Sequence, residues 1–343
     1  MSRLLSHLGP GLPILAAPMS GGPSTPALVT AAARAGGLGF LAAGYKTPKT
    51  LAEQVRTVRA DGVPFGVNVF APNPVSVSAE DYRDYVRAIR PEATLYGLRL
   101  PDGEPVEDDD HWRDKIDLLL ADPVPVVSFT FGLPGRSVVA ELRRAGTVVV
   151  QTVTSADEAR GAAGIGVDAV VVQASAAGGH SATFTPAHPP GAVPLPELIS
   201  RVRGAVPLPV IAAGGLGGPA GVAGVLAVGA EAAMIGTALL RTEESGASAP
   251  HKAALADPAF DTTVITRAFT GRPARALRNH FVERYDHVAP VGYPALHHLT
   301  GPLRKAATAA GDTRLMHLWA GTGHRHARTE PAARTFARLA GGL

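Results

Sequence analysis

The strongest constraint on the fold is a repeated pattern of short apolar runs, each followed by an alanine-rich stretch with helical spacing. Runs that are apolar at nearly every position are typical of strands buried on both faces of a parallel sheet. Eight such runs occur, at 13–19, 38–44, 64–70, 124–132, 147–153, 168–174, 208–215 and 232–239. Eight strands alternating with helices predict an α/β fold, namely a closed (β/α)8 TIM barrel rather than an open doubly wound sheet.

The segments between these runs carry helix-boundary signals. Helices are predicted at 25–36, 47–62, 135–146, 155–166 and 219–230. Several begin with Ser or Thr, which cap free N–H groups, or have Pro in the first turn, and several end in Gly. These boundaries support separate helices between the strands.

Two regions depart from the repeat. Residues 71–122 contain closely spaced prolines and the acidic run EDDDHWRD, and we expect a long connection with a helix near AEDYRDYVRAI and a solvated acidic face. Residues 241–343 show helical segments and no further strand pattern. We therefore predict a barrel over 1–240, with an insertion at about 71–122, and a mostly helical C-terminal domain or cap over 241–343.

Composition excludes several classes of protein. The chain has 343 residues, a net charge of +3 without a basic block, and 5% aromatic residues, so no nucleic-acid partner is expected. It has no cysteine, and therefore no thiolate nucleophile or thiolate metal site. Glycine, proline and charge interrupt every apolar stretch, so we expect no membrane partner, no secretory signal at the N-terminus and a cytoplasmic location. The sequence is compatible with a homodimer, since no feature of it decides the oligomeric state.

Glycine-rich loops follow the last two predicted strands. Gly214, Gly215, Gly217 and Gly218 follow one strand, and MIGTALL, which begins at Met234, ends the next. In TIM barrels these two loops commonly bind phosphate, because main-chain N–H groups can approach it closely. The alternative is that the glycines only form tight turns. Neither loop has a Walker pattern, so NTP hydrolysis is not expected.

Polar residues end the other predicted strands. Amides and hydroxyls can bind the edge of a flat heterocycle, although each residue alone is more simply an ordinary strand-end polar group. The candidates are Asn68, Ser128, Thr130, Gln151 and Gln173.

His180 follows Gly178 and Gly179 in the loop QASAAGGHSATF after the sixth predicted strand. Imidazole is well suited to accept a proton near neutral pH, and two glycines allow a sharp turn. The residues alone leave two interpretations open, a catalytic base and a structural loop histidine.

Six ordered motifs resemble the nitronate monooxygenases, formerly called 2-nitropropane dioxygenases. They are PILAAPMSGGPSTPALVTAAARAGGLGFL, FGVNVF, VVSFTFGLP, QASAAGGHSATF, PVIAAGGLGG and AAMIGTALLRTEES. TRAFTGRPARALRN at 266–279 and WAGTGHRHAR at 319–328 extend the resemblance over nearly the whole chain. It implies a TIM barrel that holds FMN noncovalently, with the histidine of the A-G-G-H motif as base, here His180.

The resemblance also implies the flavin contacts. Together with the glycine loops it gives these cofactor-binding residues: Ala17, Pro18, Met19, Asn68, Gln173, Gly178, Gly179, Gly214, Gly215, Met234, Ile235, Gly236 and Thr237. Where the family has Q-G-x-E-A-G-G-H, this chain has Ala174 and Ala176 in place of Gly and Glu. The missing carboxylate removes a possible partner that could orient the base or raise its pKa, and leaves the substrate open.

The implied reaction is the oxidation of an alkyl nitronate or nitroalkane by O2 to a carbonyl compound and nitrite. His180 would remove the α-proton of a neutral nitroalkane, and Lys305 and Tyr293 are candidates for holding the anion, although both are more simply surface residues. Two imidazole pairs, in HH at 297–298 and HRH at 324–326, lack a neighbouring acid, so no metal site is predicted.

Three other functions share parts of this pattern. An FMN-dependent NAD(P)H enoyl-acyl-carrier-protein reductase, or a related flavin oxidoreductase of specialised metabolism, shares the barrel and the A-G-G-H loop, but the C-terminal motifs favour the monooxygenases. An IMP dehydrogenase type needs a cysteine that this chain lacks. A flavin-binding protein without turnover is the third.

Overall fold

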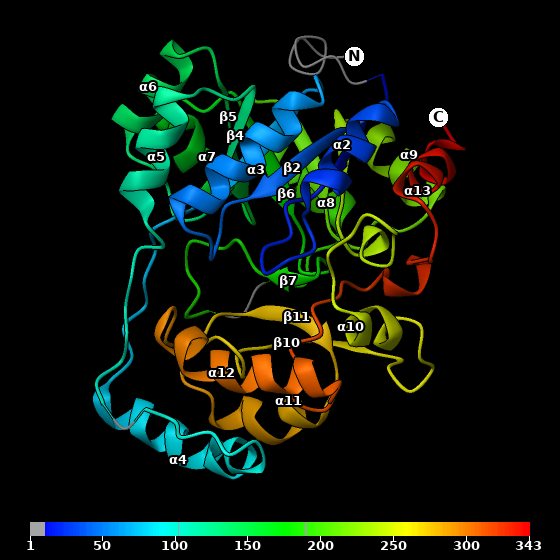
Figure 1. Cartoon of the computed structure of the whole chain (residues 1–343). Helices are drawn as coiled ribbons and strands as arrows, with labels where there is room; N and C mark the ends of the chain where they lie inside the picture. The colour runs from blue at the N-terminus through cyan, green and yellow to red at the C-terminus, as the bar shows by residue number, and fades with distance from the viewer. Residues whose placement is uncertain (1–10, 102, 189–190) are drawn as a thin grey trace.

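A computed structural model describes residues 11–101, 103–188 and 191–343. The prediction that the N-terminal segment is not a secretory signal concerns residues 1–10 in part, and these lie outside the described residues. The barrel is closed and parallel, with strand order β1-β2-β3-β4-β5-β6-β8-β9 (Figure 1). Its strands are β1 (Ile14–Ala16), β2 (Leu38–Ala42), β3 (Phe65–Ala71), β4 (Val126–Phe131), β5 (Val148–Val153), β6 (Ala169–Gln173), β8 (Val210–Ala213) and β9 (Ala232–Ile235). Seven of them lie within the predicted runs, and β3 extends one residue beyond its run, so the TIM barrel is confirmed.

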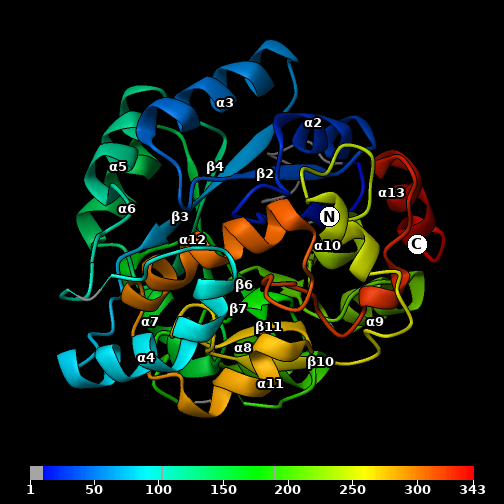
Figure 2. The ribbon, with the colours of Figure 1, turned by 60° about the horizontal axis from the view of Figure 1, so that its bottom comes forward.

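Helices surround the barrel on the outside, as Figure 2 shows from the end that carries the cap. They are α2 (Pro26–Arg34), α3 (Pro48–Ala60), α5 (Trp112–Ala121), α6 (Arg136–Arg144), α7 (Ala156–Ile165), α8 (Leu195–Ala205), α9 (Pro219–Ala227) and α13 (Ala332–Ala340). The predicted caps are present: Thr25, Thr47 and Ser155 accept hydrogen bonds from main-chain N–H groups in the first turns of α2, α3 and α7. One apolar cluster fills the barrel interior, and a larger one lies between the strands and the helices.

A cap lies against the carboxyl ends of the barrel strands, below the barrel in Figure 1. It has its own apolar core. Its elements are α4 (Ala79–Leu95), α10 (Ala249–Ala254), α11 (His280–Tyr285), α12 (Ala295–Ala310) and a three-stranded sheet of β10 (Thr263–Thr266), β11 (Ala274–Leu277) and β7 (Gly179–His180). The expectation of no strand after residue 240 is wrong. Both strands there have only four residues, too few to show a period.

The two chain segments that leave the repeat both supply the cap. The insertion after β3 contains the expected helix, α4, which packs in the cap core, whereas α5 at its end belongs to the barrel. Likewise α13 packs on α2 and α9, and so takes the place of the helix that should follow β9. The region 241–343 is therefore divided between the cap and the barrel. No described helix is long and apolar enough to cross a membrane.

Candidate active site

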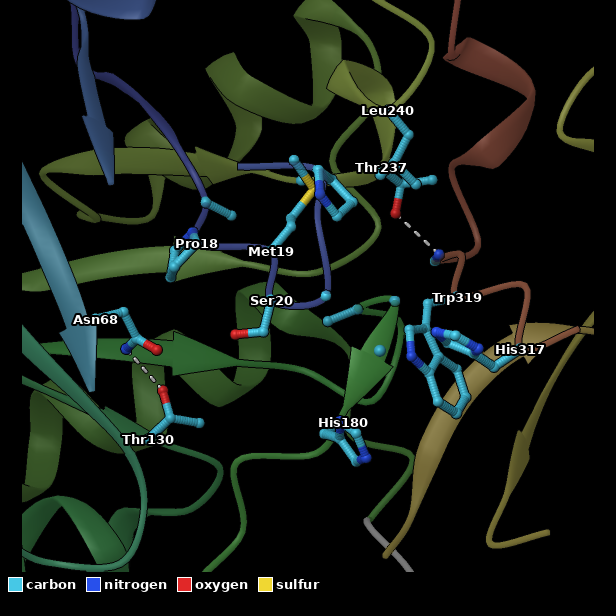
Figure 3. Close-up of a pocket in the computed structure, with 18 of the residues that line it drawn as sticks. Pro18, Met19, Ser20, Asn68, Thr130, His180, Thr237, Leu240, His317 and Trp319 are labelled. Atoms are coloured by element: carbon cyan, nitrogen blue, oxygen red, sulfur yellow. Dashed lines mark hydrogen bonds between the residues drawn. The ribbon is translucent and has the colours of Figure 1, made fainter. Parts of the chain in front are cut away.

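A cavity of about 730 Å³ lies between the carboxyl ends of the strands and the cap. This volume is typical of a site for a small molecule or cofactor. Figure 3 shows that its walls come from widely separated segments, with Pro18 and Met19 after β1, His180 in the β6 loop and Trp319 near the C-terminus. The cavity also lies where TIM-barrel enzymes place their active sites.

Of the fourteen predicted site residues, thirteen line this cavity. They are His180, Ala17, Pro18, Met19, Asn68, Gln173, Gly178, Gly179, Gly214, Gly215, Met234, Gly236 and Thr237. The exception is Ile235, whose side chain is fully buried between the barrel strands and the outer helices. Alternation of side chains along β9 places Met234 inside the barrel end and Ile235 outside it.

The loops after β6, β8 and β9 form a glycine-lined cradle. A Cβ on Gly178 would lie 2.5 Å from the main-chain nitrogen of Gly321, so only glycine lets the cap segment approach this loop. Thr237 Oγ1 accepts a 3.0 Å hydrogen bond from that same Gly321 N–H (Figure 3). Within the described chain, no main-chain acceptor takes the N–H groups of Gly215, Gly236 or Thr237. Such free N–H groups fit a phosphate.

Asn68 presents an acceptor to the barrel end of the cavity. Its Nδ2 donates to Ser128 Oγ at 2.9 Å and to Thr130 Oγ1 at 3.0 Å, which uses both amide hydrogens. Oδ1 has no partner in the described chain and can accept from the edge of a bound heterocycle. Thr130 lines the cavity, whereas Ser128 stands behind Asn68. Gln151 does not reach the site, because its amide donates to Gly132 and Thr152 carbonyls inside the protein.

His180 lies on the short strand β7, where it pairs with Ala274 of the cap. Gln173 fixes the loop from both sides: its Nε2 donates to the His180 carbonyl, and its Oε1 accepts from Ala182 N–H at 2.8 Å. Gln173 is thus engaged mainly with this loop. The imidazole ring packs against the rings of Phe131 and Trp319, with centroid separations of 5.7 Å and 5.3 Å.

Burial, with help from two guanidinium groups, lowers the pKa of His180 to about 3. The cations are Arg272 and Arg304. The imidazole is therefore uncharged at neutral pH, which is the state that a general base requires.

Cationic and neutral donors line the cap side of the cavity. Arg304 on α12 is almost fully buried, donates to the His297 carbonyl at 2.8 Å, and has no acidic partner among the described residues. Lys305 lies exposed at the rim, and His251 and His317 line the wall. None of the described lining residues is Asp or Glu. A cavity with cations and without acids favours an anionic ligand.

The residues considered as further anion or metal ligands, Tyr293, His297 and His298, contact other side chains of the protein. Tyr293 lies beside a second cavity of about 300 Å³ and donates to the Tyr45 hydroxyl at 3.2 Å. His297 stacks on Tyr45, and His298 pairs with Asp108. Within the described ranges no group of three His, Cys, Asp or Glu could hold a metal.

Ala176 lies beside the glycine-lined cradle. A Cβ on Gly215 would lie 3.2 Å from Ala176 Cβ, and the Ala176 carbonyl accepts from Thr322 N–H at 3.0 Å. The position where the family has Glu thus faces the cradle and the 321–323 turn. Ala174 is buried in the layer between strands and helices.

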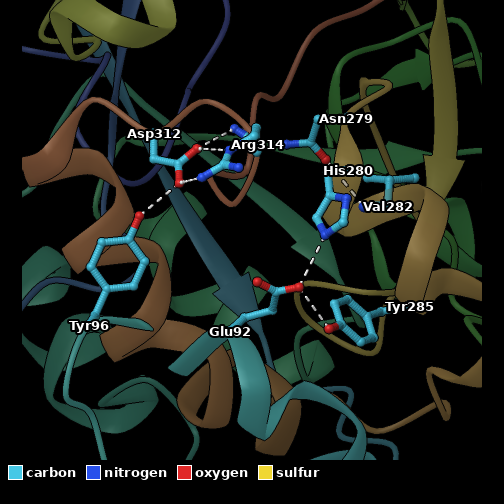
Figure 4. A network of polar contacts seen from close by, with 8 residues as sticks. All are labelled: Glu92, Tyr96, Asn279, His280, Val282, Tyr285, Asp312 and Arg314. Carbon is cyan, nitrogen blue, oxygen red and sulfur yellow. Dashed lines mark hydrogen bonds and ion pairs between the residues drawn. The ribbon is translucent and has the colours of Figure 1, made fainter. Parts of the chain in front are cut away.

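A polar network ties α4 to the rest of the cap, as Figure 4 shows. The Glu92 carboxylate accepts from His280 Nε2 at 3.1 Å and from the Tyr285 hydroxyl at 2.9 Å. Just after the end of the helix, the Tyr96 hydroxyl donates to Asp312 at 2.9 Å. These contacts hold the insertion after β3 against α11 and against the loop that follows α12.

Comparison with known proteins assigns the chain to a family. The family model described as nitronate monooxygenase matches residues 2–339. The chain belongs to the nitronate monooxygenase family. A probable nitronate monooxygenase of Staphylococcus aureus (strain JH9) is 36% identical over 338 residues, which cover 96% of this chain and 94% of that protein. The family is one of flavin enzymes, and membership makes this chain a nitronate monooxygenase-like oxidoreductase.

Solved structures agree with this assignment. Nitroalkane oxidase from Streptomyces ansochromogenes is 49% identical, covers 99% of this chain and 98% of its own, and superposes with a TM-score of 0.93. FabK from Thermotoga maritima is 26% identical, with coverages of 99% and 94% and a TM-score of 0.76. The family and the first neighbour support the oxidation of nitronates or nitroalkanes.

Proposed function

We propose that this protein binds FMN and uses O2 to oxidise alkyl nitronates to a carbonyl compound and nitrite. His180 is the base that removes the α-proton of a neutral nitroalkane, so that nitroalkanes can also serve as substrates. One observation carries the proposal: an uncharged imidazole faces a cavity that has two cations, no acid among its described lining residues and a glycine cradle at one end. A nitronate is an anion, and the cradle suits the FMN phosphate.

The residues present fit a flavin mononucleotide. The free N–H groups of Gly215, Gly236 and Thr237 would hold the phosphate, and Asn68 Oδ1 would accept from the ring edge. When bound, the flavin supplies the redox chemistry and the protein supplies position and electrostatics. His180 takes the α-proton from a neutral nitroalkane, and Arg304 then faces the resulting anion across the cavity.

The test is oxygen uptake and nitrite release by the purified yellow protein with ethyl nitronate and with nitroethane. His180→Ala should keep its flavin, because His180 has no place in the cradle. It should lose nitroethane oxidation by about 10²–10⁴-fold, the usual worth of a general base, with a much smaller loss on ethyl nitronate. Equal losses on both substrates would argue against the base role, and a colourless protein that takes up no FMN would refute the whole proposal.

A second candidate is the FMN-dependent NAD(P)H enoyl-acyl-carrier-protein reductase. The likeness to FabK supports it, although at 26% identity against 49% for the nitroalkane oxidase. Anaerobic bleaching of the flavin by NADH or NADPH would favour this activity, while oxygen uptake that is unchanged by NADH would favour nitronate oxidation.

A further inference from the structure

Thr270, in the turn between β10 and β11, touches the ring of His180. Its Oγ1 lies 2.9 Å from His180 Nε2, and the side chain is almost fully buried. We propose that Thr270 is a positioning residue that fixes the tautomer of His180, so that Nε2 carries the hydrogen and Nδ1 accepts the substrate proton. The assignment of a proton acceptor rests on the proposed function; the assignment of the tautomer does not.

The hydroxyl of Thr270 has a single hydrogen and two neighbours. One is His180 Nε2, and the other is the main-chain carbonyl of Arg272, 3.3 Å away. A carbonyl can only accept, and no main-chain N–H of the described chain donates to this one. Because Arg272 is fully buried, an unpaired carbonyl there would be costly. The hydroxyl hydrogen is therefore committed to Arg272, and Nε2 must be the donor to Thr270 Oγ1.

The other ring nitrogen is free. A neutral imidazole has one N–H, so with Nε2 protonated the lone pair lies on Nδ1. Nδ1 has no hydrogen-bond partner in the described chain, and it is not among the side-chain atoms closed off from solvent. His180 lines the cavity, so Nδ1 is the nitrogen that a substrate can reach. After proton transfer, Nε2–H keeps its bond to Thr270.

Arg272 in the same turn fixes the loop that carries the ring. Its Nε donates to the Ser181 carbonyl at 3.2 Å, and its NH2 group donates to the Thr183 carbonyl. The guanidinium carbon lies 4.0 Å from the ring centroid of Phe131, and the Phe131 ring packs against the ring of His180. The turn therefore holds both the imidazole and the main chain beside it. A cap segment some 90 residues away sets the geometry of the base.

The tautomer can be measured without activity. Two-dimensional 15N–1H spectra of histidine-labelled protein distinguish a protonated from an unprotonated ring nitrogen, and a His180→Gln variant identifies the His180 signals. We expect Nε2–H in the wild type and in Thr270→Ser. Thr270→Val has nearly the same shape but no acceptor, so the hydrogen should move to Nδ1, where water in the cavity can accept it.

Activity then tests the consequence. The ratio of kcat/KM for nitroethane to that for ethyl nitronate should fall about tenfold in Thr270→Val, the worth of one buried hydrogen bond, and be restored in Thr270→Ser. Thr57→Val, on the exposed face of α3, is the control for a lost hydroxyl. An Nδ1–H tautomer in the wild type, or an unchanged ratio in Thr270→Val, would overturn the proposal. If the wild type oxidises neither substrate, the proposed function fails, while the spectra still decide the tautomer.

Discussion

Acidification should destabilise this fold through its buried histidines. The loss of folding stability is worked out most directly for His251. Its side chain is 8% exposed and Nε2 lies 3.1 Å from the Trp319 carbonyl. Burial lowers its pKa from 6.5 to about 4. Because the unfolded chain binds the proton more tightly, stability present above about pH 6.5 is lost as the pH falls toward 4. At pH 5 the loss from His251 alone is about 2 kcal/mol.

Urea unfolding followed by circular dichroism at about pH 7.5 and about pH 5 measures this loss. His251→Gln keeps a donor for the Trp319 carbonyl but does not titrate, so its stability should fall by about 2 kcal/mol less than that of the wild type. His188→Gln, at an exposed position, should behave as the wild type does. An identical pH dependence for His251→Gln and the wild type would refute the reasoning. Burial lowers the pKa of His317 as well, so the remaining loss has the same sign.

Two further predictions concern the cavity walls. Gly178→Ala places a Cβ 2.5 Å from the Gly321 nitrogen, so the purified variant should show a lower ratio of flavin to protein absorbance, whereas Gly164→Ala, where a Cβ meets nothing within 4 Å, should match the wild type. Arg304→Met removes a buried cation that faces the ligand, so KM for ethyl nitronate should rise about tenfold or more, and KM for neutral nitroethane should change little. Equal KM changes on the two substrates would contradict this role.

The barrel was predictable because its strands are local signals. Each buried strand is a continuous apolar run, and Ser or Thr caps mark the start of the next helix, as at Thr25 and Ser155. The cap sheet gives no such signal. The strand β7 has two residues, Gly179 and His180, and becomes a strand only because it pairs with Arg275 and Ala274. That pairing depends on tertiary contacts, which the local pattern of apolar residues does not indicate.

The same division holds for the site. Glycine loops at the ends of β8 and β9 were predictable, because the barrel brings successive strand ends to one face. Arg304 was not identified, although it lies next to the predicted Lys305. Its importance comes from burial without an acidic partner, which only the packing of α12 over the cavity reveals. Thr270 lies within the motif TRAFTGRPARALRN, yet its contact with the His180 ring depends on where the cap turn lies.

The base belongs to two folding units at once. The barrel supplies the loop that carries His180 and holds this loop through Gln173. The cap supplies Thr270 and the strand β11, which pairs with the His180 strand β7. The barrel and the cap have separate apolar cores, so a change that loosens only the cap core leaves the barrel its own source of stability. Such a change would leave the loops after β8 and β9 anchored to the barrel but release the imidazole. Flavin binding and proton abstraction should therefore respond differently to cap mutations, although both take place in one cavity.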